Sequence, residues 1–296
     1  MIWLVGSKGM LGTDLEKLFI HNSLEYIATD KEVDITDPAA LNGFIKKQFA
    51  DHTLRWIINC AAYTAVDQAE EDREPCFAIN SLGPKNLAIM AEKTGATLVH
   101  ISTDYVFNGQ KKEAYVEDDP TAPLGVYGQS KLEGEKAIQE NCRQFYILRT
   151  AWLYGKNNKN FVTTMLKLFA EKDELKIISD QWGSPTYTKD LAAAILAIIK
   201  SKDTEGTEGF GIYHFTNTGR TNWFEFAREI QKQALEMGLL KKPINLVAIP
   251  TEAYPTKAKR PKNSYLSKDK LIKEFNITIP DWQNGLNRFL EELTND

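Results

Sequence analysis

The sequence predicts an α/β protein with a doubly wound parallel sheet and a smaller C-terminal lobe. Three observations lead to this prediction. Short apolar runs alternate with helix-like stretches through the first half of the 296 residues. A glycine-rich turn directly follows the first apolar run, and 43% hydrophobic residues are enough for a sizeable core. Strands this short and apolar, separated by helices, indicate buried parallel strands joined by right-handed crossovers.

The expected elements follow from these patterns in chain order. The first helix is expected around Leu11, Leu15 and Leu18, which recur at helical spacing. The expected strands are Ile2–Val5, Glu25–Thr29, Trp56–Asn59, Thr97–Ser102 and Phe145–Arg149. The further expected helices are Ala39–Phe49, Gly83–Lys93, Ser130–Glu140, Phe161–Ala170, Asp190–Lys200, Asn222–Glu236 with Thr221 as its cap, and Trp282–Leu293.

The second half is less regular than the first, and this suggests a division of labour. Residues 1–150 are expected to form the cofactor-binding domain, and residues 151–296 mainly a substrate-binding lobe. Loops rich in Gly, Thr and Pro are expected at 201–211 and 249–262. Because the composition does not shift sharply anywhere, the boundary is soft and the segments are expected to interleave.

Charge and cysteine content exclude several classes of protein. The net charge of −4, from 36 basic and 40 acidic residues, argues against a nucleic acid or an anionic membrane as the main partner. No run of 18 apolar residues is present, and the apolar start meets Gly6 without a basic leader, so it is interpreted as a strand. Cys60, Cys76 and Cys142 have no metal-site or disulfide spacing, which favours the cytoplasm.

The glycine-rich turn predicts binding of a dinucleotide. Gly6, Gly9 and Gly12 form a G-x-x-G-x-x-G pattern between the first strand and the first helix, with Met10 and Leu11 inside it. Glycines let the backbone approach a pyrophosphate, which the helix N-terminus attracts. The alternative is an ordinary strand–helix turn. No G-K-[ST] follows, so a triphosphatase loop is excluded.

The end of the second strand bears on the choice of cofactor. Asp30 lies where an acid accepts hydrogen bonds from a ribose 2′-hydroxyl, which favours NAD, whereas Lys31 suits the 2′-phosphate of NADP. The preference between NADPH and NADH therefore stays open. Asp34 and Ile35 are placed to contact the adenine, although Asp34 also fits a turn or helix cap.

Tyr127 and Lys131 predict acid–base chemistry. Four residues apart on one helix, the two side chains share a face, and a nearby ammonium is expected to lower the pKa of the phenol. Such a pair can give a proton to a substrate oxygen or take one from it. Ser102 and Thr103 end the preceding strand at the edge where ligands bind, and residues 59–63 end another strand with small side chains.

These motifs together resemble the extended short-chain dehydrogenase/reductase family, which implies a Rossmann-type fold. Four blocks sharpen the resemblance to its dTDP-4-dehydrorhamnose reductase branch: STDYVF at 102–107, YGQSKLEGE at 127–135, LRTAWLYG at 148–155 and DQWGSPT at 180–186. The resemblance covers essentially the whole chain. It implies that NADPH or NADH reduces the 4-keto group of dTDP-4-dehydro-β-L-rhamnose, the last step of dTDP-rhamnose biosynthesis.

The resemblance also implies roles for individual residues. Tyr127 would donate the proton, Lys131 would tune it and bind the nicotinamide ribose, and Thr103 would hold the keto oxygen. Asp104 and Trp152 match positions that contact the sugar. The implied cofactor contacts are Gly9, Met10 and Leu11 at the pyrophosphate, Asp34 and Ile35 at the adenine, and Ala62, Tyr63 and Thr64 at the middle, with Gly6, Gly12, Asp30, Ala61 and Ser102 completing the site.

Two features are not settled by the resemblance. Some family members hold Mg²⁺ at a dimer interface, but Glu291 and Glu292 give no recognisable ligand set, so a monomer and a homodimer both stay open. The basic loop of Lys257, Lys259, Arg260 and Lys262 is either a solvated loop or an electrostatic clamp on the substrate's diphosphate.

Two alternative functions remain at this point. A related sugar-nucleotide epimerase or dehydratase would use the same Tyr127 and Lys131 with tightly held NAD⁺. Dehydratases usually carry a pair of acids after the Ser/Thr, and here only Asp104 occupies that region. A non-catalytic regulatory subunit would keep the glycine turn, but it would have no need for Thr103, Tyr127 and Lys131.

Overall fold

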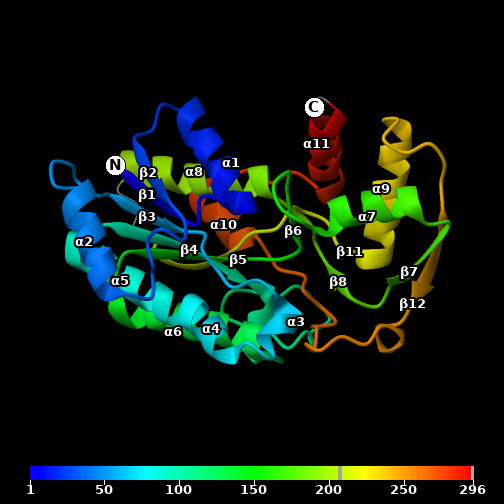
Figure 1. The fold of residues 1–296 in the computed structure, drawn as a ribbon, viewed down its shortest axis with the longest axis horizontal. Coiled ribbons are helices and arrows are strands. Elements are labelled where there is room, and N and C mark those ends of the chain that lie inside the picture. The colour runs from blue at the N-terminus through cyan, green and yellow to red at the C-terminus, as the bar shows by residue number, and fades with distance from the viewer. Residues whose placement is uncertain (206–208, 295–296) are drawn as a thin grey trace.

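A six-stranded parallel sheet forms the centre of the larger lobe in this computed structural model, which describes residues 1–205 and 209–294 (Figure 1). Its strand order is β10-β5-β4-β3-β1-β2, and each strand runs parallel to its neighbours. The doubly wound α/β prediction is confirmed. The strands are β1 (Ile2–Val5), β2 (Tyr26–Thr29), β3 (Trp56–Asn59), β4 (Thr97–Thr103), β5 (Phe145–Thr150) and β10 (Gly211–His214).

Helices cover both faces of this sheet because each face carries buried apolar side chains (Figure 1). One face packs against α1 (Met10–His21), α8 (Thr188–Glu205) and α10 (Asp269–Phe275). The other face packs against α2 (Pro38–Gln48), α5 (Gly83–Thr94) and α6 (Val126–Asn141). Three shorter elements lie between β3 and α5: α3 (Val66–Ala69), α4 (Arg73–Phe77) and the π-helix η1 (Ala78–Leu82).

The smaller lobe has a separate, aromatic-rich core (Figure 1, right). Its helices pack around Tyr154, Tyr187, Phe226 and Phe289, whose rings touch one another. The lobe contains α7 (Phe161–Glu171), α9 (Trp223–Glu236) and α11 (Trp282–Thr294), with the strand pairs β7 (Glu174–Ile178) and β12 (Asn245–Ile249), β6 (Leu153–Tyr154) and β9 (Thr186–Tyr187), and β8 (Trp182–Gly183) and β11 (Thr221–Asn222). The 3-10 turns η2 (Asp104–Val106) and η3 (Thr251–Ala253) lie in the connecting segments.

The chain crosses between the lobes more than once after residue 150. β10 pairs with β5 in the main sheet, and α8 packs on α1, although both elements come from the C-terminal half. Residues 151–296 therefore supply an edge strand and two covering helices to the sheet as well as the smaller lobe.

Two local predictions need correction. The expected loop at 201–211 begins as helix, since α8 continues to Glu205, and β10 begins at Gly211; residues 206–208 lie outside the described residues. Thr221 does not cap α9, because the side chain of Asn222 accepts the backbone N–H of Glu225 at 2.8 Å. No helix in the described part of the chain is long and apolar enough to cross a membrane.

Candidate active site

The glycine turn brings the first helix directly against the ends of two strands. Gly6 has a φ of +79°, and a Cβ there would lie 2.6 Å from the backbone nitrogen of Ala61. A Cβ on Gly12 would lie 2.3 Å from the carbonyl oxygen of Gly6. Gly9 is the N-cap of α1 and provides no side-chain acceptor, so the first-turn N–H groups stay available for an anion.

A cavity of about 370 Å³, the loop cavity, lies beside this turn. Asp30 and Lys31 both line it, so the structure places both cofactor-discriminating groups together. Asp34 also lines it, but its Oδ1 accepts hydrogen bonds from the N–H and hydroxyl of Thr36 at 2.8 and 2.7 Å, which lowers its pKa. The other predicted cofactor residues on its wall are Gly6, Gly9, Ile35, Ala61 and Ala62.

The loop cavity meets a second one, the central cavity of about 500 Å³, at Gly9, Cys60 and Ala62. Together the two form a trough along the carboxyl ends of the strands. Asp30 lines the part of the trough that belongs to the loop cavity, and Tyr127 lines the part that belongs to the central cavity. The predicted residues that line the central cavity are Gly9, Met10, Leu11, Gly12, Ala62, Thr64, Ser102, Thr103, Asp104, Tyr127, Lys131 and Trp152.

Tyr63 is the predicted site residue that the structure does not bring to either cavity. Its hydroxyl donates to Asp72 at 2.8 Å, and its backbone N–H donates to Asn80 at 2.8 Å. The residue therefore ties the 63–80 segment together and lines neither cavity.

Thr103 and Asp104 are buried at the centre of the site, and the half-buried Tyr127 lines the same cavity. The hydroxyl of Thr103 donates to Asp104 at 3.0 Å. Burial raises the pKa of Asp104 to about 6, against hydrogen bonds from Ser264 and Thr103. Burial also raises the pKa of Tyr127, opposed by Thr103 and assisted by Asp104. The expected lowering of the Tyr127 pKa is therefore wrong for this structure, because desolvation dominates, and the phenol is held as a proton donor.

Lys131 lies about one turn after Tyr127 on α6 and lines the same cavity, with only 1% of its surface exposed. Its ammonium donates to the carbonyl oxygen of Ile101 at 2.7 Å and lies 3.1 Å from Nε2 of His100. Burial lowers the pKa of Lys131 to about 8, while Glu135 acts in the opposite direction. A lysine with this pKa can exchange a proton near neutral pH.

Ser102 connects the end of β4 to α6. Its hydroxyl donates to Glu135 at 2.5 Å, and Glu135 accepts a charge-assisted hydrogen bond from Arg149 at 2.7 Å. All three side chains are nearly inaccessible to solvent. Through these contacts the helix that carries Tyr127 and Lys131 is fixed to strands β4 and β5.

Trp152 marks the boundary between the central cavity and the smaller lobe. Its backbone has a φ of +50°, an uncommon conformation for a bulky residue, and its ring stacks on Trp223 at a centroid distance of 3.7 Å. Gly183 makes room for this stack, since a Cβ there would lie 2.8 Å from the Trp152 ring. The indole is thereby held rigidly in the wall of the site.

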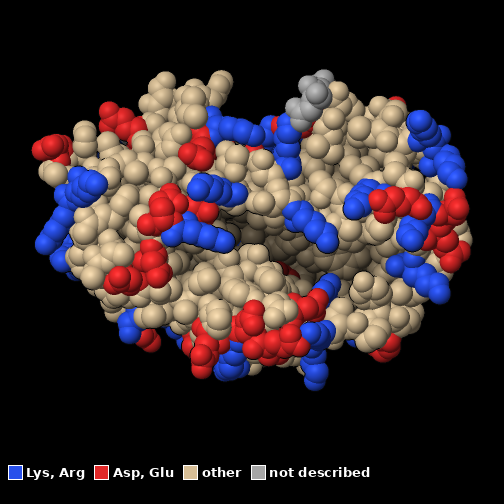
Figure 2. Space-filling view, viewed as in Figure 1, with Lys and Arg blue, Asp and Glu red and all other residues tan. Residues whose placement is uncertain are grey.

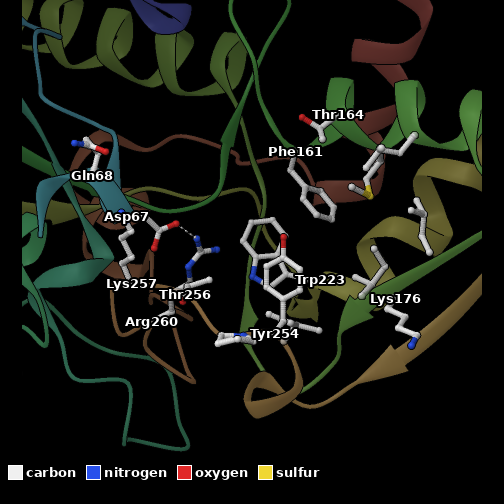
Figure 3. A pocket seen from close by; sticks show the side chains of 16 residues that line it. Asp67, Gln68, Phe161, Thr164, Lys176, Trp223, Tyr254, Thr256, Lys257 and Arg260 are labelled. Atoms are coloured by element: carbon white, nitrogen blue, oxygen red, sulfur yellow. Dashed lines mark hydrogen bonds and ion pairs between the residues drawn. The ribbon is translucent and has the colours of Figure 1, made fainter. Parts of the chain in front are cut away.

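A third cavity of about 880 Å³, the lobe cavity, lies on the other side of this stack. Figure 3 shows the aromatic rings of Phe161, Trp223 and Tyr254 along its wall, with Asp67 and Arg260 facing each other at its entrance. Figure 2 shows the hollow between the lobes, with acidic and basic side chains along its rim.

The basic loop is largely paired with acids rather than free. Arg260 bonds Asp67 at 2.9 Å, and Lys257 bonds Glu71 at 2.6 Å. Lys262 lies within 4 Å of both Asp180 and Glu252. Lys257 and Arg260 still line the lobe cavity, so a phosphate group there would have two cations within the wall.

The C-terminal acids do not form a metal site. Glu292 accepts a hydrogen bond from Tyr187 at 2.7 Å and is ion-paired with Lys189. Among residues 1–205 and 209–294, no group of three or more His, Cys, Asp or Glu side chains is arranged to hold a metal ion.

Several lining residues had no motif to reveal them. Trp223 was expected only as part of a helix, and Phe161 likewise, whereas Asn158 and Lys159 of the central cavity come from an irregular loop. The available signal was compositional: an aromatic residue at the N-terminus of each of two expected helices. Tyr254, which is 55% exposed, had no distinguishing pattern.

Comparison with known proteins adds an independent view of the same chain. Residues 1–295 match the family model described as "RmlD substrate binding domain". The chain is 40% identical over 298 residues to a dTDP-4-dehydrorhamnose reductase of Shigella flexneri, covering 99% of this chain and 97% of the relative. A solved reductase of that name from Clostridium acetobutylicum is 38% identical with a TM-score of 0.91, covering 99% of both chains. One from Bacillus anthracis, solved in complex with NADP, is 37% identical with a TM-score of 0.90, covering 98% of both.

Proposed function

The chain belongs to the RmlD substrate binding domain family, and on that premise we propose that it reduces the 4-keto group of dTDP-4-dehydro-β-L-rhamnose to give dTDP-β-L-rhamnose, in dTDP-rhamnose biosynthesis. The observation that carries this function is the convergence of Thr103, Tyr127 and Lys131 on one cavity. A reductase needs a proton donor beside a hydride donor, and this cluster supplies the proton.

A nicotinamide cofactor fits the trough. The N-terminus of α1 has no side-chain cap, and the cradle around Gly6 and Gly12 leaves no room for a Cβ, as expected where backbone must approach a pyrophosphate. When bound, the cofactor supplies the hydride that the carbonyl carbon receives. Both NADPH and NADH are proposed as donors, because Asp30 and Lys31 line the same cavity; the NADP complex of the Bacillus anthracis protein supports the first.

The protein's own contribution is the proton and the orientation of the carbonyl. When substrate binds, the Thr103 hydroxyl turns its one hydrogen from Asp104 to the keto oxygen, and Tyr127 transfers its phenolic proton to that oxygen as the carbon is reduced. The raised pKa of Tyr127 keeps the phenol protonated until negative charge develops on the oxygen. Asp104 and Trp152 orient the sugar from either side of the central cavity.

We propose that the nucleotide end of the substrate occupies the lobe cavity. That cavity adjoins the central one across the Trp152–Trp223 stack, so an elongated substrate can extend from one to the other. Aromatic rings are suited to stack on a thymine base, and Lys257 and Arg260 are suited to a diphosphate.

The direct test is a spectrophotometric assay. Purified protein is mixed with NADPH or NADH and the 4-keto-6-deoxy sugar nucleotide, and loss of absorbance from the reduced nicotinamide is followed. Oxidation equal to the sugar consumed supports the reductase. Sugar conversion without net oxidation would instead indicate the epimerase alternative, and no conversion of any kind would indicate a non-catalytic subunit.

The cellular setting is part of the same proposal. Cys60, Cys76 and Cys142 are free thiols, which fits a reducing compartment, and we propose the cytoplasm. A monomer and a homodimer are both compatible with the site as described, since its catalytic residues all come from one chain.

A further inference from the structure

A buried chain of hydrogen bonds lies behind Lys131 and is not explained by the proposed roles. The backbone N–H of Ala61 donates to Oδ1 of Asn59 at 3.0 Å. Nδ2 of Asn59 lies 3.0 Å from Nδ1 of His100, and Nε2 of His100 lies 3.1 Å from Nζ of Lys131. Asn59 and His100 are fully buried, on the neighbouring strands β3 and β4.

The backbone N–H of Ala61 fixes which group donates and which accepts in each of these hydrogen bonds. An N–H needs an acceptor, so the Ala61 N–H requires that the amide oxygen of Asn59 face it. The amide nitrogen then faces Nδ1 of His100 and donates to it. Burial, with the Lys131 charge beside it, holds the pKa of His100 well below its usual range, so the ring is neutral. A neutral imidazole that accepts at Nδ1 carries its hydrogen on Nε2.

This tautomer directs an N–H at Nζ of Lys131. An ammonium group there meets another donor, whereas a neutral amine accepts a hydrogen bond from it. The remaining titratable neighbours of Lys131 are the thiols Cys60 and Cys76 and the carboxylate of Glu135. The last is itself bound to Arg149, so its charge is shared with that guanidinium.

We propose that Asn59 and His100 are positioning residues that weaken the hold of Lys131 on its proton, so that the lysine can resupply a proton to Tyr127 in each turnover. This inference rests on the reductase function proposed above and specifies how its proton donor is recharged. A lysine pKa of about 8 agrees with it.

Each proton transferred in one turnover is replaced before the next. Tyr127 gives its proton to the oxygen of the reduced carbonyl and becomes a phenolate. The ammonium of Lys131, which lines the same cavity as Tyr127, passes a proton to that phenolate through solvent in the cavity and becomes a neutral amine, which then accepts the N–H of His100. The amine regains a proton from solvent after product leaves. His100 keeps its own proton throughout, so it acts only by orientation.

The first test determines the tautomer in the native protein, and a variant serves only to assign the signals. Two-bond ¹H–¹⁵N correlation spectra of the protein labelled with ¹⁵N-histidine report which ring nitrogen carries the hydrogen, and loss of one set of signals in His100→Gln assigns that residue. We expect the Nε2–H tautomer, unchanged between pH 6 and 9. A proton on Nδ1, or titration of the ring in this range, would overturn the inference.

The second test reverses the tautomer. In Asn59→Asp, the carboxylate can accept from both the Ala61 N–H and Nδ1–H of His100, which leaves Nε2 as an acceptor for the ammonium. The pKa of Lys131 should rise, and the alkaline limb of kcat/KM should move up by about one pH unit. The matched control is Asn59→Asp combined with His100→Gln, which adds the same charge without the imidazole and should lose most of the shift.

The outcomes separate this inference from the proposed function. If the native protein shows no reductase activity, the function fails, and the NMR result still decides the tautomer. If the native protein is active and folded Asn59→Asp has an unshifted profile, the positioning role fails alone. If Asn59→Asp does not fold, the spectra of the native protein provide the decision.

Discussion

The site joins two regions that are built in opposite ways. The strand-end region, from Gly6 to Lys131, consists of backbone turns and polar side chains at the ends of adjacent parallel strands. The lobe region, around Trp223 and Tyr254, consists of side chains brought together from segments that are well separated in the sequence, such as those of Phe161, Trp223 and Tyr254. The first is held by a sheet and has little freedom to change shape. The second depends on ring packing and ion pairs between separate segments.

Under the proposed function, this difference predicts that the first region governs chemistry and the second governs recognition. Catalytic distances must be held within a fraction of an ångström, and a sheet with a buried Glu135–Arg149 pair provides that rigidity. Recognition of a nucleotide tolerates adjustment, and an aromatic wall with surface ion pairs provides it. Substitutions in the first region should therefore lower kcat, and those in the second should mainly raise KM.

The largest expected effect is at Tyr127. Removing its hydroxyl in Tyr127→Phe should lower kcat by about 10²–10⁴-fold, because no proton reaches the substrate oxygen, while cofactor binding measured by fluorescence stays unchanged. Tyr63→Phe is the matched control and should keep near-native turnover, since Tyr63 bonds Asp72 outside the trough. Near-native turnover in Tyr127→Phe would mean that another group donates the proton.

The second effect concerns the backbone cradle. Gly12→Ala should lower kcat/KM by on the order of a hundredfold, because its Cβ would overlap the carbonyl of Gly6 and displace the turn. Gly43→Ala is the control, because nothing lies within 4 Å of a Cβ added there. Its helix should become more stable by up to about 1 kcal/mol. Equal kinetics in both variants would show that the turn does not shape the cofactor site.

Asp104 tests the point where the regions meet, because Thr103 holds it from the sheet and Ser264 from the C-terminal segment. Its pKa of about 6 lies above the ordinary 3.8, so the folded protein binds the proton more tightly than the unfolded chain. The protonated Asp104 carboxyl therefore adds to the free energy of unfolding at about pH 4 and below, and this contribution is lost as the pH rises through 6.

Compared with the native protein, the free energy of unfolding of Asp104→Asn should therefore rise by about 2–3 kcal/mol as the pH increases from 4 to 7. Urea unfolding at a series of pH values measures this difference. Asp118→Asn, at an exposed acid, is the control for loss of a charge. A constant difference between Asp104→Asn and the native protein across this range would contradict the assigned pKa.

The smallest effect belongs to the lobe region. Tyr254→Ala should raise the KM for the sugar nucleotide about tenfold, through loss of one stacking surface, and should leave kcat and cofactor affinity nearly unchanged. Tyr254→Phe keeps the ring and should restore KM. A kcat effect in Tyr254→Ala as large as its KM effect would erase the proposed division between the regions.

Sequence alone was sufficient for most of the strand-end region because its residues are local to strand–turn–helix units. The glycine turn, the residues after β4 and the pair on α6 each occupy a short stretch whose spacing is dictated by the element itself. The structure then brought these stretches to one edge of the sheet, as parallel pairing requires.

The lobe region could not be predicted in the same way. Phe161, Trp223 and Tyr254 meet only through tertiary contacts, and an aromatic residue at a helix start is equally consistent with core packing. The prediction of a lowered pKa for Tyr127 was wrong for a different reason. Spacing showed that Lys131 shares its face, but the pKa depends on burial, which only the folded structure reveals.

The return of the chain to the main sheet has a consequence for its synthesis. After β5 is complete, more than thirty residues must be synthesised before α8 begins, and more than fifty before β10 begins. Until then, Leu15 and Phe19 on α1 lack the partners Leu191 and Ile195 that cover them in the finished protein. The nascent N-terminal half therefore keeps an apolar helix face exposed during this interval, and a chain that stalls there would be a substrate for chaperones.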